Sequence, residues 1–239
     1  MQSGERLPTL ILLPGLDGTG KFLANFATAL GANVESRIIG YPPAEPAGYE
    51  ELENRVRAAL PQDRPFVLLG ESFSGPIAIR IAARGPANLV GVILCGTFAK
   101  NPYPVPGWAA ALACRMPIKS LPRWVRAPLM WGSKDSAWAP RQADRAIAGV
   151  AKAVLRRRIT AILNVDASES LGQIRVPALI LYPRQDRVVR FAATQLLIKQ
   201  LTHAIVEPME GPHLLLQSRP AECARIVLEF LHQGVATRD

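Results

Sequence analysis

The stretch LLGESFSGPIAI, residues 68–79, joins an apolar run to an apolar segment of helical spacing through a very short turn. Ser72 lies in the middle of this turn, which is so tight that the residues two before and two after the serine must be small. Gly70 and Ser74 meet this need, although glycine is more usual at the second position. Gly75, which has no Cβ, lets the helix pack closely against the strand. The stretch therefore predicts a strand, a turn and a helix that expose the Ser72 hydroxyl as a nucleophile. A serine that only caps a helix is the alternative.

Short apolar runs alternate with stretches of helical period along most of the 239 residues, which is typical of a parallel sheet covered by helices. The runs that indicate strands start at Thr9, Val34, Pro65, Leu89, Pro177 and His203. The stretches that indicate helices cover residues 22–30, 49–60, 73–84, 191–200 and 220–233. We therefore predict an α/β fold with a mostly parallel sheet of about six strands and with helices on both faces.

This alternation stops between residues 97 and 171, where the sequence contains helical segments but no convincing strand. We predict a helical cap or lid at residues 98–171, laid over the end of the sheet between a first core part, residues 1–97, and a second core part, residues 172–239. All four tryptophans fall in the predicted cap: Trp108, Trp124, Trp131 and Trp138. They are expected to form either the interior of the cap or the wall of an apolar acyl pocket.

Positive charge is concentrated in the same interval. The chain has a formal net charge of +9, and residues 100–172 hold twelve Lys or Arg against four Asp or Glu. The run RRR at residues 156–158 belongs to this excess and is expected to be a solvated helix face. The alternative is a docking surface for an acidic carrier such as acyl-carrier protein or coenzyme A. No nucleic-acid recognition motif accompanies the charge, so we predict no nucleic-acid partner.

The first loop of the predicted sheet, within PGLDGTGKF, raises a nucleotide-binding alternative. Gly15 and the pair Gly20-Lys21 have the spacing of a phosphate-binding loop that follows a strand. Such a loop needs Ser or Thr at the next position to hold magnesium, but this chain has Phe22 there, and neither of the next buried strands ends in Asp. We therefore predict that the loop does not bind a nucleotide.

The same loop could instead stabilise a developing negative charge. Because it follows the first strand, its backbone is able to approach the active serine, and the N–H of Leu16 would point at a carbonyl oxygen. The N–H of Phe73, just after the nucleophile, would supply the second donor of this oxyanion hole. Asp17, Gly18 and Gly20 are expected to shape the turn, and Lys21 to be a solvated residue at a helix start.

A serine nucleophile needs a general base, which in this architecture lies late in the chain. The chain has three histidines. His203 begins a predicted strand, and His232 lies on the last predicted helix, where it is expected to be exposed. His213 follows the last strand and is therefore the predicted base.

The base in turn needs an orienting carboxylate between the serine and the histidine in chain order. Asp186 follows the strand that starts at Pro177, and the carboxyl ends of strands are where ligands bind in open α/β sheets. Asp186 is therefore the predicted acid, although an Asp in this position often only caps the next helix. Asp135 and Asp166, inside the predicted cap, are poorer candidates.

The three cysteines, Cys95, Cys114 and Cys223, lie far apart and have neither metal-site nor disulfide spacing, so reduced structural thiols are expected. No apolar run approaches the roughly 20 residues that span a bilayer. The first residues lack the basic and apolar segments of a signal peptide. These features predict a cytoplasmic protein without a membrane span.

Taken together, the chain resembles the α/β-hydrolase superfamily from the first strand to the last helix. The resemblance rests on PGLDGTG, GESFSG, PALILYPRQDRVV and GPHLLLQSRP, in the order of the family. It extends to bacterial carboxylesterases, to pimeloyl-acyl-carrier-protein methyl ester esterases and to the hydrolase-like part of plant phytyl ester synthases. The resemblance implies that Ser72 is the nucleophile, His213 the base and acid, Asp186 the orienting acid, and Leu16 and Phe73 the oxyanion hole. Family members usually have an antiparallel hairpin before the first loop, so a shortened sheet is expected here.

The combined prediction is a serine carboxylesterase that forms an acyl-enzyme on Ser72, acts on a small ester with an apolar acyl part, and needs no metal or organic cofactor. An acyltransferase, or a hydrolase of esters or thioesters linked to acyl-carrier protein or coenzyme A, would use the same residues. A non-catalytic binding protein, a hydroxynitrile lyase and a cofactor-free haloperoxidase are further alternatives. Dehalogenases and epoxide hydrolases of this fold use an aspartate nucleophile, and Ser72 argues against both.

Overall fold

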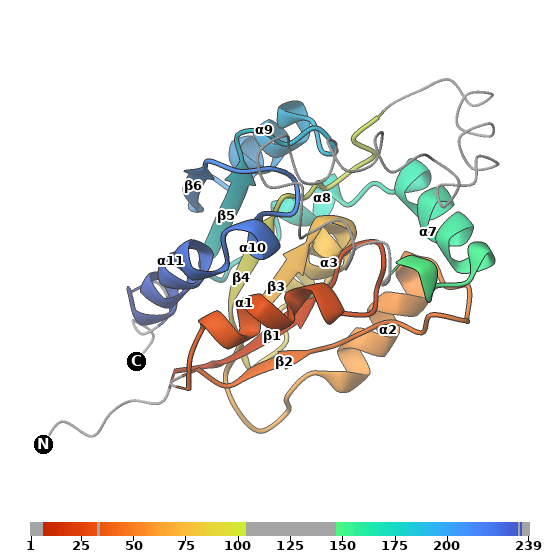
Figure 1. Cartoon of the computed structure of the whole chain (residues 1–239). Helices are drawn as coiled ribbons and strands as arrows, with labels where there is room; N and C mark the ends of the chain where they lie inside the picture. Colours follow the sequence, from red (N-terminus) through yellow and green to blue (C-terminus); the bar gives the residue numbers. More distant parts are fainter. Residues whose placement is uncertain (1–6, 33, 104–146, 234, 236–239) are drawn as a thin grey trace, which may run out of the picture.

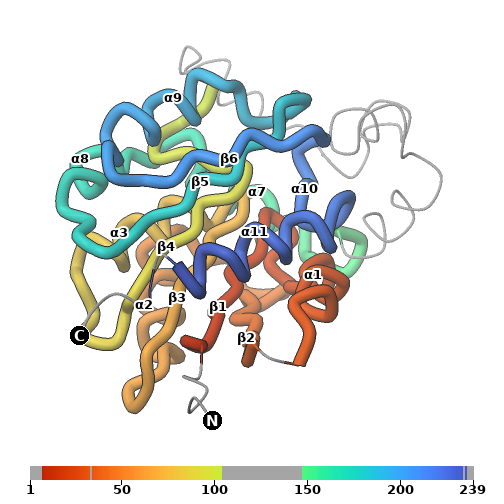
Figure 2. Tube along the Cα trace, turned by 90° about the vertical axis from the view of Figure 1, so that its left-hand side faces the viewer, coloured from red at the N-terminus to blue at the C-terminus, as the bar shows by residue number. Residues whose placement is uncertain are grey.

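The central sheet has six strands in the order β2-β1-β3-β4-β5-β6, and every neighbouring pair is parallel. This arrangement is that of a computed structural model, which describes residues 7–32, 34–103, 147–233 and 235. The strands are Thr9–Leu13 (β1), Ser36–Ile38 (β2), Phe66–Glu71 (β3), Leu89–Cys95 (β4), Ala178–Pro183 (β5) and Ile205–Met209 (β6). Figure 2 shows them side by side in this order. The predicted parallel sheet is confirmed.

Helices cover both faces of the sheet, as the sequence predicts (Figure 1). One face packs against α1 (Ala24–Ala29), α10 (Leu215–Ser218) and α11 (Pro220–Gln233). The other face packs against α2 (Tyr49–Ala59), α3 (Gly75–Arg84), α8 (Ser168–Leu171) and α9 (Phe191–Gln200). Successive residues of one strand point to opposite faces. Leu10 and Leu12 therefore pack against the face covered by α1, α10 and α11, while Ile11 and Leu13 pack against the face covered by α2, α3, α8 and α9. Because both faces are covered, the inner strands β1, β3, β4 and β5 are apolar over most of their length rather than alternating, whereas the edge strands β2 and β6 are partly exposed.

The strand order places two loops at the point where the sheet changes direction. The chain moves outward from β1 to β2 and then returns to place β3 on the other side of β1. The loops after β1 and β3 therefore lie next to each other at the carboxyl ends, and Leu13 is in register with Gly70. Open α/β sheets bind their ligands at such a switch point. These two loops carry Leu16 and Ser72.

The described part of the predicted cap consists of its two ends. Helix α7 (Lys152–Asn164) lies beside α2, away from β6 (Figure 1). Phe98, Ala99, Val165 and Leu171 pack into the same core as α2 and α3, so the outermost residues of the predicted cap belong to the body of the protein. Its boundaries at residues 98 and 171 stay a prediction. The four tryptophans, Cys114 and Asp135 lie outside the described residues.

None of the helices in the described part of the chain is both long enough and apolar enough to cross a membrane.

Candidate active site

Ser72 has the strained backbone of a nucleophile turn. Its φ is 48°, and it is the one non-glycine residue with a positive φ among those described. A short 3₁₀ helix, Ser72–Ser74, links β3 to α3. A Cβ at Gly70 would lie 2.8 Å from that of Ala78, and one at Gly75 would lie 1.8 Å from a threonine hydroxyl oxygen. The prediction that the turn tolerates only small residues is confirmed at Gly70, and the strain at Ser72 is typical of a nucleophile elbow.

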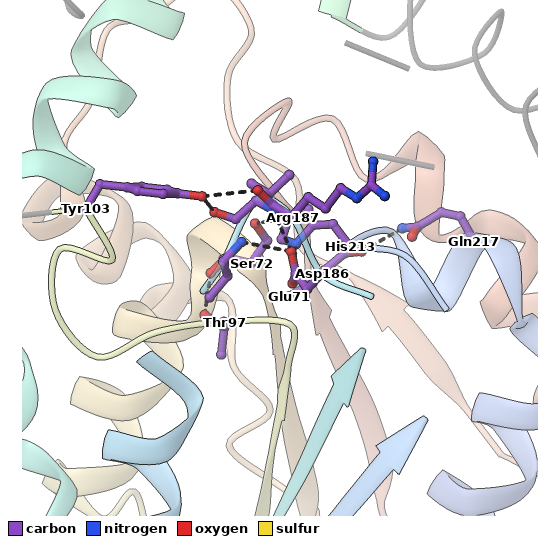
Figure 3. Close-up of polar contacts among 10 residues, drawn as sticks. Glu71, Ser72, Thr97, Tyr103, Asp186, Arg187, His213 and Gln217 are labelled. Carbon is purple, nitrogen blue, oxygen red and sulfur yellow. Dashed lines mark hydrogen bonds and ion pairs between the residues drawn. The ribbon is translucent and has the colours of Figure 1, made fainter. Parts of the chain in front are cut away.

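The structure brings the three predicted catalytic side chains together (Figure 3). Ser72 Oγ lies 2.9 Å from Nε2 of His213. Nδ1 of His213 lies 2.8 Å from Oδ2 of Asp186. The side chains of His213 and Asp186 are only 3% and 7% exposed, so water has little access to their contact. This geometry allows a proton to pass from the serine to an imidazole whose tautomer is fixed by the carboxylate.

The loop between β5 and α9, residues 184–190, holds Asp186 in place and is called the acid loop below. Oδ1 of Asp186 accepts hydrogen bonds from the N–H groups of Val188, at 2.7 Å, and Val189, at 2.8 Å. Oδ2 is thereby left for His213. Asp186 thus orders the turn before α9 as well as facing the histidine, so the helix-capping alternative and the proposed acid role are compatible.

The competing candidates lie elsewhere. His203 lies in the turn before β6, where its Nε2 is 3.2 Å from the carbonyl oxygen of Val176. His232 is exposed on α11, as predicted, and its Nδ1 is 2.7 Å from the carbonyl oxygen of Leu228. Asp166 is exposed and accepts hydrogen bonds from its neighbour Ser168.

The loop after β1 is a structured turn. Oδ2 of Asp17 accepts a hydrogen bond from the N–H of Thr19 at 2.9 Å, and Gly18 has a φ of 70°. These contacts confirm that Asp17 and Gly18 shape the turn. Lys21 is exposed at the start of the 3₁₀ helix Lys21–Leu23, which confirms that it is a solvated residue.

The predicted oxyanion donors flank the switch point. Within the described residues, no acceptor is hydrogen-bonded to the N–H of Leu16, which therefore remains available to a substrate. Phe73 is fully buried, and its ring stacks on that of Tyr49 with the ring centroids 4.8 Å apart. This packing fixes the residue that carries the second predicted donor. The role of the two N–H groups stays a prediction.

Ser74 has a polar role that sequence reasoning missed. Its hydroxyl donates a hydrogen bond to the carbonyl oxygen of Pro14, and its oxygen lies 2.5 Å from the Tyr41 hydroxyl. Since the Ser74 proton is used, Tyr41 donates to Ser74. The serine that replaces the usual glycine thus ties the elbow to the loop that carries Leu16. The departure from the usual pattern was the only signal of this role.

Two further hydroxyls hold the site from outside the three predicted residues (Figure 3). Thr97, just after β4, donates to the carbonyl oxygen of Ser72. Tyr103 donates to the carbonyl oxygen of Val188 in the acid loop. The position of Thr97 at a strand end is a signal that sequence reasoning could have used; Tyr103 has no such signal.

Glu71, directly before Ser72, is a buried acid whose charge sequence reasoning did not consider. It is 3% exposed, and its Oε1 accepts a hydrogen bond from Nε2 of Gln217 at 2.7 Å. Burial raises its pKa from 4.5 to about 7, although the hydrogen bond from Gln217 and the proximity of His213 act in the opposite direction. Glu71 therefore changes charge near neutral pH beside Ser72.

The prediction that residues 156–158 form one solvated helix face is wrong for Arg158. Arg156 and Arg157 are exposed, but Arg158 is buried. Val154 and Leu155 are buried on the same helix, and Arg158 follows Val154 by four residues, so it points to the same side. At about 100° per residue, Arg156 and Arg158 point to nearly opposite sides of the helix, and Arg158 points to the buried side.

The thiols of the described chain are structural. Cys95 and Cys223 are free and buried, as predicted, and burial raises the pKa of both, that of Cys223 to about 12. Over the residues that the structure describes, no group of three or more His, Cys, Asp or Glu is placed to hold a metal ion.

Comparisons with known proteins identify the family of the chain. A sequence model of the family described as "Alpha/beta hydrolase family" matches residues 10–226. The protein named "Putative carbamate hydrolase RutD" from Rhizobium rhizogenes is 27% identical over 93% of this chain and 92% of its own length. Phytyl ester synthase 1 of Arabidopsis thaliana is 36% identical over 86 residues, which make up 34% of this chain but only 12% of the plant protein.

Solved structures share the fold. The enol-lactonase from Burkholderia xenovorans superimposes with a TM-score of 0.84 over 97% of this chain and 94% of its own, at 18% identity. An esterase from Exiguobacterium antarcticum gives a TM-score of 0.79 over 95% and 92% of the two chains, at 15% identity. Because the family model covers most of the sequence and the sheet has the same fold as these structures, the chain belongs to the alpha/beta hydrolase family and is a hydrolase.

Proposed function

We propose that the chain is a serine carboxylesterase that hydrolyses a carboxylic ester through an acyl-enzyme on Ser72. The observation that carries this proposal is the continuous hydrogen-bonded path from Ser72 Oγ through His213 to Asp186, built on a strained elbow. A partly exposed serine with an oriented base is the arrangement that activates a hydroxyl for acyl transfer.

In the first step Ser72 Oγ attacks the ester carbonyl carbon while Nε2 of His213 accepts the hydroxyl proton. For Nε2 to accept, the other ring nitrogen must carry its proton, and the contact of Nδ1 with Asp186 selects that tautomer. The carboxylate also stabilises the imidazolium as it forms. The negative charge on the former carbonyl oxygen is received by the N–H groups of Leu16 and Phe73.

The tetrahedral intermediate then collapses. The bond to the alcohol oxygen breaks, and His213 delivers the proton from Ser72 to the departing alcohol. Water attacks the resulting acyl-enzyme as His213 accepts one of its protons, and the acid leaves while Ser72 recovers its proton. These two reaction steps need no metal ion or organic cofactor. The apolar residues of the cap, residues 98–171, would enclose the acyl part.

The test is hydrolysis of p-nitrophenyl esters, from acetate to laurate, by the wild type and by Ser72→Ala. Ser170→Ala is a matched control, because Ser170 lies on α8 and not on the loops that carry the proposed catalytic residues. We expect Ser72→Ala to lose about 10⁴-fold or more in kcat and the control to keep full activity. The chain-length preference of the wild type then measures the acyl site. Activity that survives in Ser72→Ala, or a wild type that neither hydrolyses esters nor reacts with a fluorophosphonate, contradicts the proposal.

Acyl transfer to an alcohol is the second candidate, and the likeness to phytyl ester synthase 1 over 86 residues favours it. Such an enzyme would use the same three residues but exclude water from the acyl-enzyme. With an added alcohol present, such an enzyme would form more of the new ester, relative to the free acid, than the mole fraction of the alcohol accounts for. One relative is named a putative carbamate hydrolase, so a p-nitrophenyl carbamate should be tested alongside the p-nitrophenyl esters.

Docking of an acyl carrier has a weaker basis than the sequence indicated. Of the three consecutive arginines on α7, Arg158 is buried and Arg157 forms an ion pair with Glu51 at 3.3 Å. If a carrier does dock at the cap, activity on a carrier-bound ester falls steeply between low and moderate salt while activity on a small ester does not.

A further inference from the structure

Arg158 is a buried cation that contacts the loop after β1. It is only 1% exposed although its side chain starts on α7, in the described end of the predicted cap. Nη1 donates hydrogen bonds to the carbonyl oxygens of Leu16, at 2.9 Å, and Asp17, at 2.7 Å. Nη2 donates to the carbonyl oxygen of Pro42 at 3.2 Å. One guanidinium thus joins the cap helix to two loops of the core.

The loop is shaped around this guanidinium. A Cβ at Gly18 would lie 2.4 Å from Nη1 of Arg158, so only a glycine leaves room for it. The guanidinium carbon also lies 5.6 Å from the centroid of the Tyr41 ring, close enough for a cation–π contact. Its planar fork of donors suits two adjacent carbonyl groups, which the point charge of a lysine does not match.

The placement of Arg158 is costly for a residue that would only fill space. No carboxylate among the described residues lies within ion-pair distance of it, and its Nε has no hydrogen-bond partner in the same set. A buried guanidinium without an ion pair carries a large desolvation penalty. Burial also lowers its pKa, although Tyr41 and Asp17 act against this. An apolar side chain would fill the same volume without this penalty, so the hydrogen bonds to the loop require another explanation.

The carbonyl groups that Arg158 binds belong to the segment that carries the proposed oxyanion donor. Fixing the carbonyl groups of Leu16 and Asp17 fixes the peptide planes on the far side of Leu16, while Ser74 holds the carbonyl of Pro14 on the near side. The N–H of Leu16 lies between these two anchors. Oxyanion donors must be held within a few tenths of an ångström of their working position before the charge develops.

We propose that Arg158 is a positioning residue for the oxyanion hole, through which the cap helix α7 sets the rate of the chemical step. The inference rests on the proposed function, because it assigns a task to a residue that touches neither the substrate nor the reacting atoms. Without the guanidinium fork, the carbonyl groups of Leu16 and Asp17 lose their hydrogen bonds to the cap helix. The turn bond from the Gly18 N–H to the Gly15 carbonyl oxygen and the Ser74 contact remain, but the N–H of Leu16 is held less precisely in the direction of the oxyanion.

The experiment compares Arg158→Met and Arg158→Lys with Arg157→Met, a matched control on the exposed side of the same helix. Fluorophosphonate titration counts the folded active sites, so that kcat is expressed per working enzyme. We expect Arg158→Met to lower kcat by about 10²-fold with KM within about twofold, because the oxyanion donor is displaced while the groups that bind the substrate stay in place. The kcat of Arg158→Lys should lie between those of the wild type and Arg158→Met, and the kcat of Arg157→Met should equal that of the wild type.

A second measurement separates this role from a structural one. A trifluoromethyl ketone adds to Ser72 and places an oxyanion in the hole, so its affinity should fall by the same factor as kcat/KM. A lower melting temperature with unchanged kcat per active site, or a lower kcat with unchanged ketone affinity, would overturn the inference. If Arg158→Met does not fold, the lysine variant is judged by the same two criteria. Loss of the proposed function is recognised separately, since the wild type itself would then lack Ser72-dependent activity.

Discussion

Glu71→Gln tests the charge state of the acid that precedes the nucleophile. Glu71 is the last residue of β3, is 3% exposed, and has the amide of Gln217 as its hydrogen-bond partner. Among the described residues, no Lys or Arg forms an ion pair with it. Burial is the largest influence on its pKa, which rises from 4.5 to about 7. Glutamine keeps an acceptor for the Gln217 amide and cannot ionise.

The magnitude follows from linkage. The folded chain keeps the Glu71 proton between pH 4.5 and about pH 7, whereas the unfolded chain releases it over this range. The free energy of unfolding therefore falls as pH rises through this window and stays low above it. The rise in pKa corresponds to about 3 kcal/mol at about 1.4 kcal/mol per unit, most of which falls between pH 5 and pH 8.

The assay is urea unfolding of the wild type and Glu71→Gln at both pH values, with equal m-values required for the comparison. We expect the variant to gain about 2 to 3 kcal/mol relative to the wild type on going from pH 5 to pH 8. Glu229→Gln is the control, since Glu229 is an exposed partner of Arg225 on α11 and should show a change below about 0.5 kcal/mol. Parallel pH curves for the wild type and Glu71→Gln would refute the reasoning, because they would mean that Glu71 titrates alike in the folded and unfolded chain.

Three other substitutions test the site. Asp186→Asn should lower kcat by about 10³ to 10⁴-fold in steady-state ester hydrolysis, with little change in melting temperature, because the amide no longer selects the active histidine tautomer; a fall below tenfold would contradict this. Ser74→Ala should lower the free energy of unfolding by about 1 to 3 kcal/mol, because it leaves the buried Tyr41 hydroxyl unpaired, and adding Tyr41→Phe should recover part of this loss in urea unfolding. Gly75→Ala, whose Cβ would lie 1.8 Å from a threonine hydroxyl oxygen, should lower the melting temperature strongly, whereas Gly172→Ala, with open space around it, should not; equal melting temperatures would contradict the packing argument.

The sheet and the three central residues were predictable because each leaves a local trace in the sequence. A strand buried on both faces is a short apolar run, and functional residues of parallel sheets follow such runs directly. Asp186 and His213 each follow a strand in this way, and Ser72 lies between a strand and a helix that both had to be apolar. Helix α9 begins and ends at the predicted residues, Phe191 and Gln200, for the same reason.

Arg158 was missed because charge was given more weight than periodicity. Three consecutive arginines suggest a solvated surface, but a helix turns by about 100° per residue, so the first and the third point to nearly opposite sides. The spacing from Val154 to Arg158 is that of residues on one helix face, and Val154 is buried. This signal was present in the sequence. The loop that receives the guanidinium was not identifiable from it, because that contact joins residues more than 140 positions apart.

Ser74 shows that the hydrogen bonds around the site cannot all be predicted from the sequence motif. The steric rule at the elbow asks only for a small side chain, and it does not distinguish glycine from serine. A buried hydroxyl, however, must be paired, and the partners of Ser74 are the carbonyl of Pro14 and the hydroxyl of Tyr41. Tyr41 in turn lies under the guanidinium of Arg158. The elbow, the loop with Leu16 and the cap helix are therefore parts of one connected network. A relative with glycine at the elbow lacks the Ser74 link and must hold that loop by other contacts, so the oxyanion geometry cannot be transferred between family members from the motif alone.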